Sequence, residues 1–91
     1  MFTVYVLFSE KYQKIYIGYT SDLLNRMKSH NKLGTGGFTL KYRPWKVIFV
    51  SIYQEKHLAM KQEKFLKSGQ GRNLIHNQII PQMQLIGFIS A

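Results

Sequence analysis

Two apolar segments near the start of the chain predict a β-hairpin. FTVYVLF, residues 2–8, and KIYIG, residues 14–18, are rich in β-branched and aromatic residues, and the polar stretch SEKYQ lies between them. Side chains alternate between the two faces of a strand. A common core requires one face of the hairpin to carry Val4, Val6, Phe8, Ile15 and Ile17. The opposite face then carries Thr3, Tyr5, Leu7, Lys14, Tyr16 and Gly18. The apolar pattern therefore predicts that two tyrosines share one face.

The next segment, TSDLLNRMKSHN at 20–31, has the pattern of an amphipathic helix with Thr20 or Ser21 as its N-cap. Its predicted apolar stripe consists of Leu23, Leu24 and Met27. Arg26 and His30 are four residues apart, so they lie one above the other beside this stripe.

A loop and a third strand follow. GTGGFTLKYRP, residues 34–44, combines glycines with the cations Lys41 and Arg43, which predicts a mobile, basic loop. KVIFVSIY, residues 46–53, is an almost unbroken apolar run. Such a run is typical of a central strand covered on both faces.

The last third of the chain predicts two helices. The first spans 55–68, and its inward-facing residues are expected to be Leu58, Ala59, Phe65 and Leu66. Glu63 falls at the edge of that stripe. Residues 69–80 predict a turn and a short helix that Pro81 ends or follows. We expect one domain over 1–80 and an apolar tail over 81–91.

Composition restricts the function classes. The chain has 91 residues, of which 45% are apolar and 14% aromatic, enough for one folded domain with a real core. It has no cysteine, which excludes disulfides and thiolate zinc sites. The apolar start lacks a basic leader and a small-residue cleavage site, and it is too short to span a bilayer. We therefore expect a cytoplasmic protein.

The charge points to a polyanionic partner. Thirteen Lys and Arg face four Asp and Glu, a formal net charge of +9. Such an excess on a small surface attracts nucleic acid, with an affinity that depends on salt. Basic charge attracts DNA and RNA phosphates alike, so both stay open. The plainer alternative is a basic protein without a specific partner.

Five positions and their spacing resemble the GIY-YIG nuclease superfamily. They are Tyr5 within VYVL, Tyr16 within YIG, Arg26 ten residues after Tyr16, His30 one helical turn later, and Glu63 on a later helix. The first motif reads Val-Tyr-Val rather than Gly-Ile-Tyr, but its tyrosine is kept. FTLKYRPWKVIF and EKFLKSGQGR are similar to the small stand-alone bacterial branch, and the pattern also resembles the N-terminal nuclease domain of an excision-repair endonuclease.

The resemblance implies an α/β (α+β) fold with a small three-stranded antiparallel sheet flanked by helices. It also implies metal-dependent hydrolysis of DNA phosphodiesters, in repair or recombination. Glu63 would be the ligand of Mg²⁺ or Mn²⁺, to which one carboxylate is enough if phosphate and water complete the shell. Arg26 would bind phosphate. Tyr5 would hold or deprotonate the water, and Tyr16 would orient it.

The chemistry of these residues sets further expectations. An ordinary tyrosine has a pKa of about 10, and we expect nearby Arg26, Lys14 and a metal to favour the Tyr5 phenolate. His30 titrates nearer neutrality and can share or relay the proton. Four residues are expected to contact or admit the nucleic acid, namely Lys14, Gly18, Lys41 and Arg43.

Family members often place an Asn after the metal-binding Glu. The usual distance falls here on Ile75, with Asn73 and Asn77 two residues to either side, and the sequence does not choose between them.

Each residue alone also has a structural explanation. The tyrosines can be cross-strand packing, and Glu63 can be the i, i+4 partner of Lys67. Two other functions remain open: a non-catalytic nucleic-acid-binding module, and an adaptor that recruits a larger repair or recombination protein.

Overall fold

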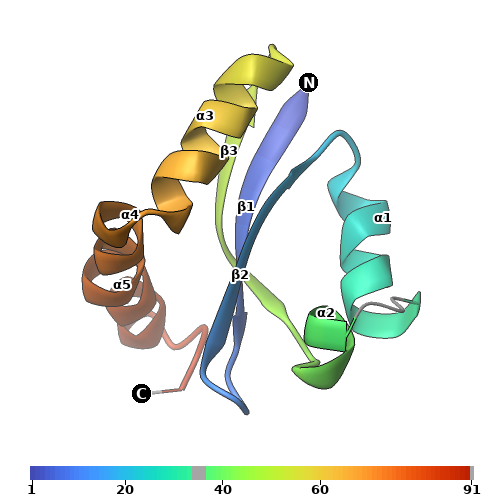
Figure 1. The fold of residues 1–91 in the computed structure, drawn as a ribbon. Coiled ribbons are helices and arrows are strands. Elements are labelled where there is room, and N and C mark those ends of the chain that lie inside the picture. Colours follow the sequence, from blue (N-terminus) through green and yellow to red (C-terminus); the bar gives the residue numbers. More distant parts are fainter. Residues whose placement is uncertain (34–36, 91) are drawn as a thin grey trace.

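The computed structural model describes residues 1–33 and 37–90 and shows a three-stranded antiparallel sheet between two groups of helices (Figure 1). The strands are β1 (Phe2–Ser9), β2 (Lys14–Thr20) and β3 (Lys46–Tyr53), in the order β2-β1-β3. One group of helices comprises α1 (Leu23–Lys28), the π-helix η1 (Ser29–Leu33) and α2 (Gly37–Lys41). The other comprises α3 (Lys56–Lys67), α4 (Gly69–Leu74), the π-helix η2 (Ile75–Ile79) and α5 (Ile80–Leu85). The predicted fold class is confirmed.

The predicted hairpin and its two faces are also confirmed. Tyr5 pairs with Gly18, Leu7 pairs with Tyr16, and other cross-strand pairs join the apolar side chains of the opposite face. Directly opposed residues point to the same side of a sheet. The two tyrosines therefore share a face, as the alternation of apolar residues requires.

The prediction that 46–53 is the central strand is wrong. β1 lies between β2 and β3, and β3 is an edge strand. Val50 and Ile52 of β3 are exposed, whereas residues 4–9 of β1 are all buried. Both strands are apolar runs of similar length, so the pattern does not show which of them receives cover on both faces.

Helices on each face of the sheet build a separate core. On one face β1 and β2 pack against α3 and the carboxy-terminal helices, through Val4, Val6, Phe8, Ile17, Ala59, Leu66, Ile75, Ile79, Ile80 and Ile89. On the other face Tyr5, Leu7 and Trp45 are buried against Tyr16, Leu23, Met27, Tyr42 and Val47. The face of the sheet that carries Tyr5 and Tyr16, the tyrosine face, is therefore covered by α1 and by the segment that leads into β3.

Several details of the predicted helices are wrong. The N-cap of α1 is Asp22, whose carboxylate accepts from the backbone N–H of Asn25 at 3.2 Å; Thr20 instead accepts from the N–H of Asp22. Leu24 is 78% exposed and is not part of the stripe, whereas Leu23 and Met27, four residues apart on one side of the helix, pack against the buried cluster. Leu58 and Phe65 of α3 are likewise exposed.

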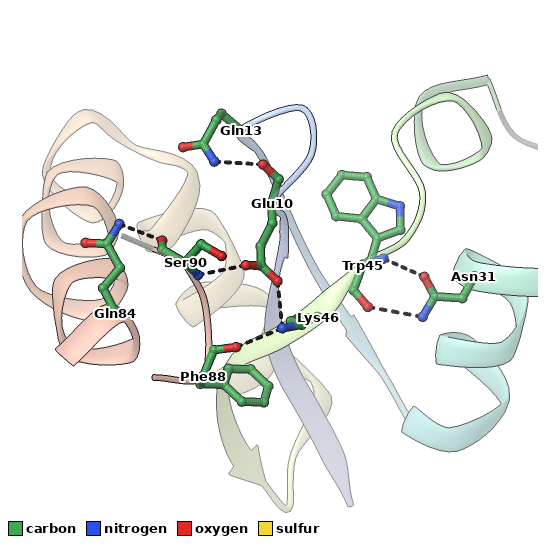
Figure 2. Close-up of polar contacts among 8 residues, drawn as sticks. All are labelled: Glu10, Gln13, Asn31, Trp45, Lys46, Gln84, Phe88 and Ser90. Atoms are coloured by element: carbon green, nitrogen blue, oxygen red, sulfur yellow. Dashed lines mark hydrogen bonds and ion pairs between the residues drawn. The ribbon is translucent and has the colours of Figure 1, made fainter. Parts of the chain in front are cut away.

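The predicted loop 34–44 is partly helical. Residues 37–41 form α2, while 34–36 lie outside the described residues. Two hydrogen bonds then tie the end of this segment to η1 (Figure 2): the side chain of Asn31 accepts from the N–H of Trp45 at 2.7 Å and donates to its carbonyl at 3.2 Å. Trp45 is thereby fixed over the tyrosine face.

The helix after α3 continues through Pro81 to Leu85, contrary to the prediction that it ends there. Pro81 is the second residue of α5, which follows the π-helix η2 without a break. The boundary between a domain at 1–80 and a tail at 81–91 stays a prediction. The described residues contain no helix long and apolar enough to cross a membrane.

A polar clamp holds the last residues against the sheet (Figure 2). The ammonium group of Lys46 donates to the carbonyl of Phe88 at 2.8 Å and pairs with Glu10 at 2.6 Å. Glu10 also accepts from the backbone N–H of Ser90 at 2.7 Å, and these contacts lower the pKa of its carboxyl. The buried Ile89 lies between the two clamped residues.

We predict that Gly71→Ala destabilises the fold by about 3 kcal/mol or more. A Cβ at Gly71 would overlap the carbonyl of Phe65 and the backbone of Leu66, and backbone cannot move aside as a side chain can. The measurement is urea denaturation. Gly69→Ala is the control, because nothing lies within 4 Å of its added Cβ, and it should change stability by less than about 1 kcal/mol. Equal effects of the two variants would contradict this packing.

Candidate active site

A buried hydrogen bond joins a tyrosine and a histidine beneath the helices of the tyrosine face. The hydroxyl of Tyr5, on the central strand, lies 3.0 Å from Nε2 of His30, on η1. Tyr5 is 1% exposed and His30 4% exposed. A hydroxyl or ring nitrogen buried to this extent needs a partner, and each of these two groups provides one for the other.

The environment keeps both groups neutral. Burial raises the pKa of Tyr5, the nearby Tyr16 raises it further, Arg26 lowers it and Glu63 raises it. Burial lowers the pKa of His30, and the charge of Arg26 lowers it further. At neutral pH the phenol therefore keeps its proton, and it donates to Nε2 in the tautomer of His30 that carries its own proton on Nδ1.

Of the two cations expected to favour the phenolate of Tyr5, Arg26 is confirmed to do so and Lys14 is not. Arg26 does act in that direction, but burial outweighs it. Lys14 is not among the groups that shift the pKa of Tyr5. Its ammonium lies instead over the ring of Tyr42, 5.5 Å from the centroid. The buried imidazole beside Tyr5, rather than a surface cation, is the group placed to take its proton.

Tyr16 completes the cluster. Its half-buried ring lies 4.8 Å from the ring of His30 and 6.3 Å from that of Tyr5, measured between centroids. Gly18 makes this arrangement possible. A Cβ at Gly18 would lie 2.7 Å from the Tyr5 hydroxyl oxygen and 3.3 Å from Cε1 of Tyr16. The Tyr5 ring therefore takes the space that we expected Gly18 to leave for substrate.

Two charged residues act on Tyr5 from different helices. Arg26 is exposed on α1, and Glu63 comes from α3, which packs against both β1 and β2. Each contributes to the pKa of Tyr5, so each lies within electrostatic reach of its hydroxyl. The structure thus brings Tyr5, Tyr16 and His30 into contact, and it places the opposite charges of Arg26 and Glu63 near them.

Glu63 can act as a cation ligand, and its carboxylate already pairs with the ammonium of Lys67. Its side chain is 21% exposed, and its carboxylate lies 3.5 Å from the ammonium of Lys67 one turn along α3. Within the described ranges, no group of three or more His, Asp or Glu gathers to hold a metal. One partly buried carboxylate suits Mg²⁺, which keeps several waters and uses substrate phosphate as ligand. Glu63 therefore fits a metal that is completed by the substrate.

The residues predicted to contact nucleic acid divide into two sets. The ammonium groups of Lys14 and Lys41 both lie over the ring of Tyr42, at 5.5 Å and 5.4 Å from its centroid, and both lysines are exposed. Arg43 is directed inward instead: its Nε donates to the carbonyl of His30 at 2.8 Å. Arg43 thus holds the backbone that carries the histidine.

The two candidate asparagines share one groove. Asn73 and Asn77 line one groove together with Gln70, Leu74, Gln78 and Phe65. Ile75, between them, is fully buried in the first core.

A small pocket opens beside Tyr16 and was missed in the sequence. It has a volume of about 260 Å³ and is lined by Ile15, Tyr16, Ile17, Phe38, Lys67 and Arg72. Phe38 falls in a segment predicted to be a loop, and Arg72 in one predicted to be a turn. Their meeting depends on α2 and α4 approaching β2, which no spacing along the chain indicates.

Comparisons with known proteins give a family and several relatives. Residues 1–76 match the family described as the GIY-YIG catalytic domain. Over 58 residues the chain is 40% identical to the structure-specific endonuclease subunit SLX1 homolog of Giardia intestinalis, covering 60% of this chain and 16% of that protein. Over 52 residues it is 38% identical to the UPF0213 protein YazA of Bacillus subtilis, covering 57% and 52%. The matches thus span less than two thirds of these relatives.

A solved structure agrees with the fold. The solution NMR structure of the UPF0213 protein BH0048 from Bacillus halodurans superposes with a TM-score of 0.53 and 27% sequence identity, covering 90% of both chains.

We predict that Gly18→Ala destabilises the protein by about 1–3 kcal/mol, because the added methyl group collides with the buried Tyr5 ring. Urea denaturation measures the loss. Gly37→Ala is the matched control: no atom lies within 4 Å of its added Cβ, so its stability should stay close to that of the wild type. If the two substitutions have the same effect, the close approach of Tyr5 to Gly18 is wrong.

Proposed function

Because the chain belongs to the GIY-YIG catalytic domain family, we propose that it is a metal-dependent endonuclease that hydrolyses phosphodiester bonds of DNA. The observation that carries the proposal is the hydrogen bond between Tyr5 and His30. It joins an O–H group to a buried neutral base, within reach of the charges of Arg26 and Glu63. Packing alone does not require that combination.

In the proposed reaction Tyr5 and His30 move one proton each. A water that attacks the phosphorus gives its proton to the Tyr5 hydroxyl oxygen, while the Tyr5 proton passes to Nε2 of His30. The phenol thereby acts as a base without first ionising, which its raised pKa disfavours. The departing sugar oxygen takes its proton from solvent.

The other residues hold the phosphate. The guanidinium of Arg26 offers a fixed pair of donors to phosphate oxygens, and Tyr16 orients the water beside His30. Glu63 is the proposed ligand for Mg²⁺ or Mn²⁺. When bound, such a cation supplies positive charge that stabilises the phosphate as it is attacked. Lys14 and Lys41, which share the Tyr42 ring, are proposed to bind flanking phosphates.

We further propose a cytoplasmic role in DNA repair or recombination, with a larger protein selecting the target. The Giardia relative is named as a subunit of a structure-specific endonuclease, which supports dependence on a partner. RNA stays open as a substrate, because the net charge of +9 attracts either nucleic acid.

We predict that Glu63→Gln reduces cleavage at least about 100-fold while DNA binding is kept, because a neutral amide removes the proposed metal ligand but changes little else. Labelled duplex, single-stranded and branched DNA are incubated with Mg²⁺, Mn²⁺ or EDTA. Glu55→Gln is the control: it makes the same change at an exposed position that pairs with His57. Absence of cleavage by the wild type, with binding intact, would favour the non-catalytic module.

We predict that the rate of cleavage rises with pH and levels off at a lower pH than a histidine of ordinary pKa would give. The reaction needs neutral His30, whose pKa lies below its ordinary value of 6.5, so the neutral fraction grows as the pH passes that lower value. His30→Gln should lower the cleavage rate at least about 100-fold and abolish this rise of the rate with pH. His57→Gln, at an exposed histidine, should leave the rise of the rate with pH unchanged.

The same shift predicts a pH-dependent stability. Below pH 6.5 the unfolded chain protonates His30 more readily than the folded one, so the free energy of unfolding should fall as the pH is lowered from 6.5 toward the folded pKa. Urea denaturation across this range should show a smaller fall in His30→Gln. An unchanged slope in that variant would assign the dependence to another group.

A further inference from the structure

The pocket beside Tyr16 lies at the free edge of the sheet, because β2 is an edge strand. Ile15, Tyr16 and Ile17 of β2 line it, together with Phe38 of α2 and with Lys67 and Arg72 of α3 and α4, two helices that lie on the other side of the sheet from α2 (Figure 1). Tyr16 belongs both to this pocket and to the cluster with His30. A group bound in the pocket is therefore the immediate neighbour of one bound at the proposed catalytic cluster.

One side of the pocket carries two cations that are not neutralised within it. Lys67 pairs with Glu63 at 3.5 Å, and none of the described residues that line the pocket is acidic. The Nε of Arg72 donates to the carbonyl of Lys67 at 3.2 Å, which fixes the direction of the guanidinium. Its two terminal nitrogens make no hydrogen bond to other described residues. A guanidinium held in this way matches the oxygens of a phosphate group.

The other side carries an aromatic ring that is exposed and also packs against three other rings. Phe38 is 47% exposed. Its ring lies 4.9 Å from Tyr42, 5.9 Å from Trp45 and 6.3 Å from Tyr16, between centroids. Trp45 is fixed in turn by a hydrogen bond from its ring N–H to the carbonyl of Thr39. An exposed ring supported by neighbours in this way can stack on a nucleobase with little loss of side-chain freedom.

We propose that this pocket binds one nucleotide next to the bond that is cleaved, with Arg72 and Lys67 on its phosphate and Phe38 stacked on its base. The inference rests on the proposed nuclease function and narrows its substrate. A base that stacks on Phe38 is not stacked in a duplex. The substrate is therefore a nucleic acid with an unpaired nucleotide at the cleavage point, as in a single strand or a branch.

The test measures binding without cleavage. Fluorescence anisotropy in EDTA gives the affinity for a labelled single-stranded oligonucleotide and for a duplex of the same length. Phe38→Leu should weaken single-strand binding about 10-fold and leave duplex binding unchanged, because stacking on an aromatic ring needs an exposed base. Phe38→Trp should restore the affinity.

Arg72→Gln should weaken binding and reduce the slope of log affinity against log salt by about one phosphate contact. Lys64→Gln is the matched control, since it removes one exposed positive charge from α3 without touching the pocket. Lys67 is left unchanged because it also pairs with Glu63. Arg72 is exposed, so its variant tests the pocket even if Phe38→Leu does not fold.

Either of two results overturns the pocket. The first is that Phe38→Leu weakens duplex and single-strand binding equally, which would make the ring a structural support. The second is that Arg72→Gln behaves like Lys64→Gln. If the wild type cleaves and either of these results is found, the proposed nucleotide pocket is wrong and the proposed nuclease function stands. Absence of cleavage, with binding that depends on Phe38 and Arg72, defeats the nuclease and supports the nucleotide site.

Discussion

The burial of one hydroxyl constrains much of this small structure. Tyr5 lies on the central strand, where neither face of the sheet is open to water, and its oxygen needs a partner from another element. His30 is that partner, and it in turn must stay neutral to remain buried. This hydrogen-bonded pair depends on the position of η1, which carries His30. It also depends on Gly18 opposite Tyr5 and on the helices that cover this face of the sheet.

Contacts at three points hold the pair in place. Gly18 leaves the space that the Tyr5 ring fills. Arg43 donates to the carbonyl of His30, and Asn31, the next residue of η1, makes two hydrogen bonds to the backbone of Trp45 (Figure 2). Arg43 therefore serves the site through backbone contacts with η1. A cation that looks available to DNA in the sequence is here a residue that positions the histidine.

The sequence predicts what depends on short-range periodicity. Alternation in β1 and β2 is enough to put Tyr5 and Tyr16 on one face, and register then follows from burial. The sequence does not predict which of two similar strands is central in the sheet. β1 and β3 are both apolar runs, and only their packing decides that β1 is central. The sequence also does not predict the direction of the pKa shift of Tyr5. Burial raises this pKa and outweighs the charge of Arg26, and burial depends on tertiary packing that the motif does not show.

The proposed catalytic cluster and the proposed nucleotide pocket are joined by two residues with a role in each. Tyr16 touches His30 on one side and lines the pocket on the other. Lys67 lines the pocket while it pairs with Glu63 at 3.5 Å, so a cation that binds Glu63 competes with Lys67 for the same carboxylate. Because Lys67 also lines the pocket, a phosphate bound there would compensate the charge of an ammonium displaced from Glu63. Metal and nucleotide would then bind cooperatively, because each removes the charge imbalance that the other creates.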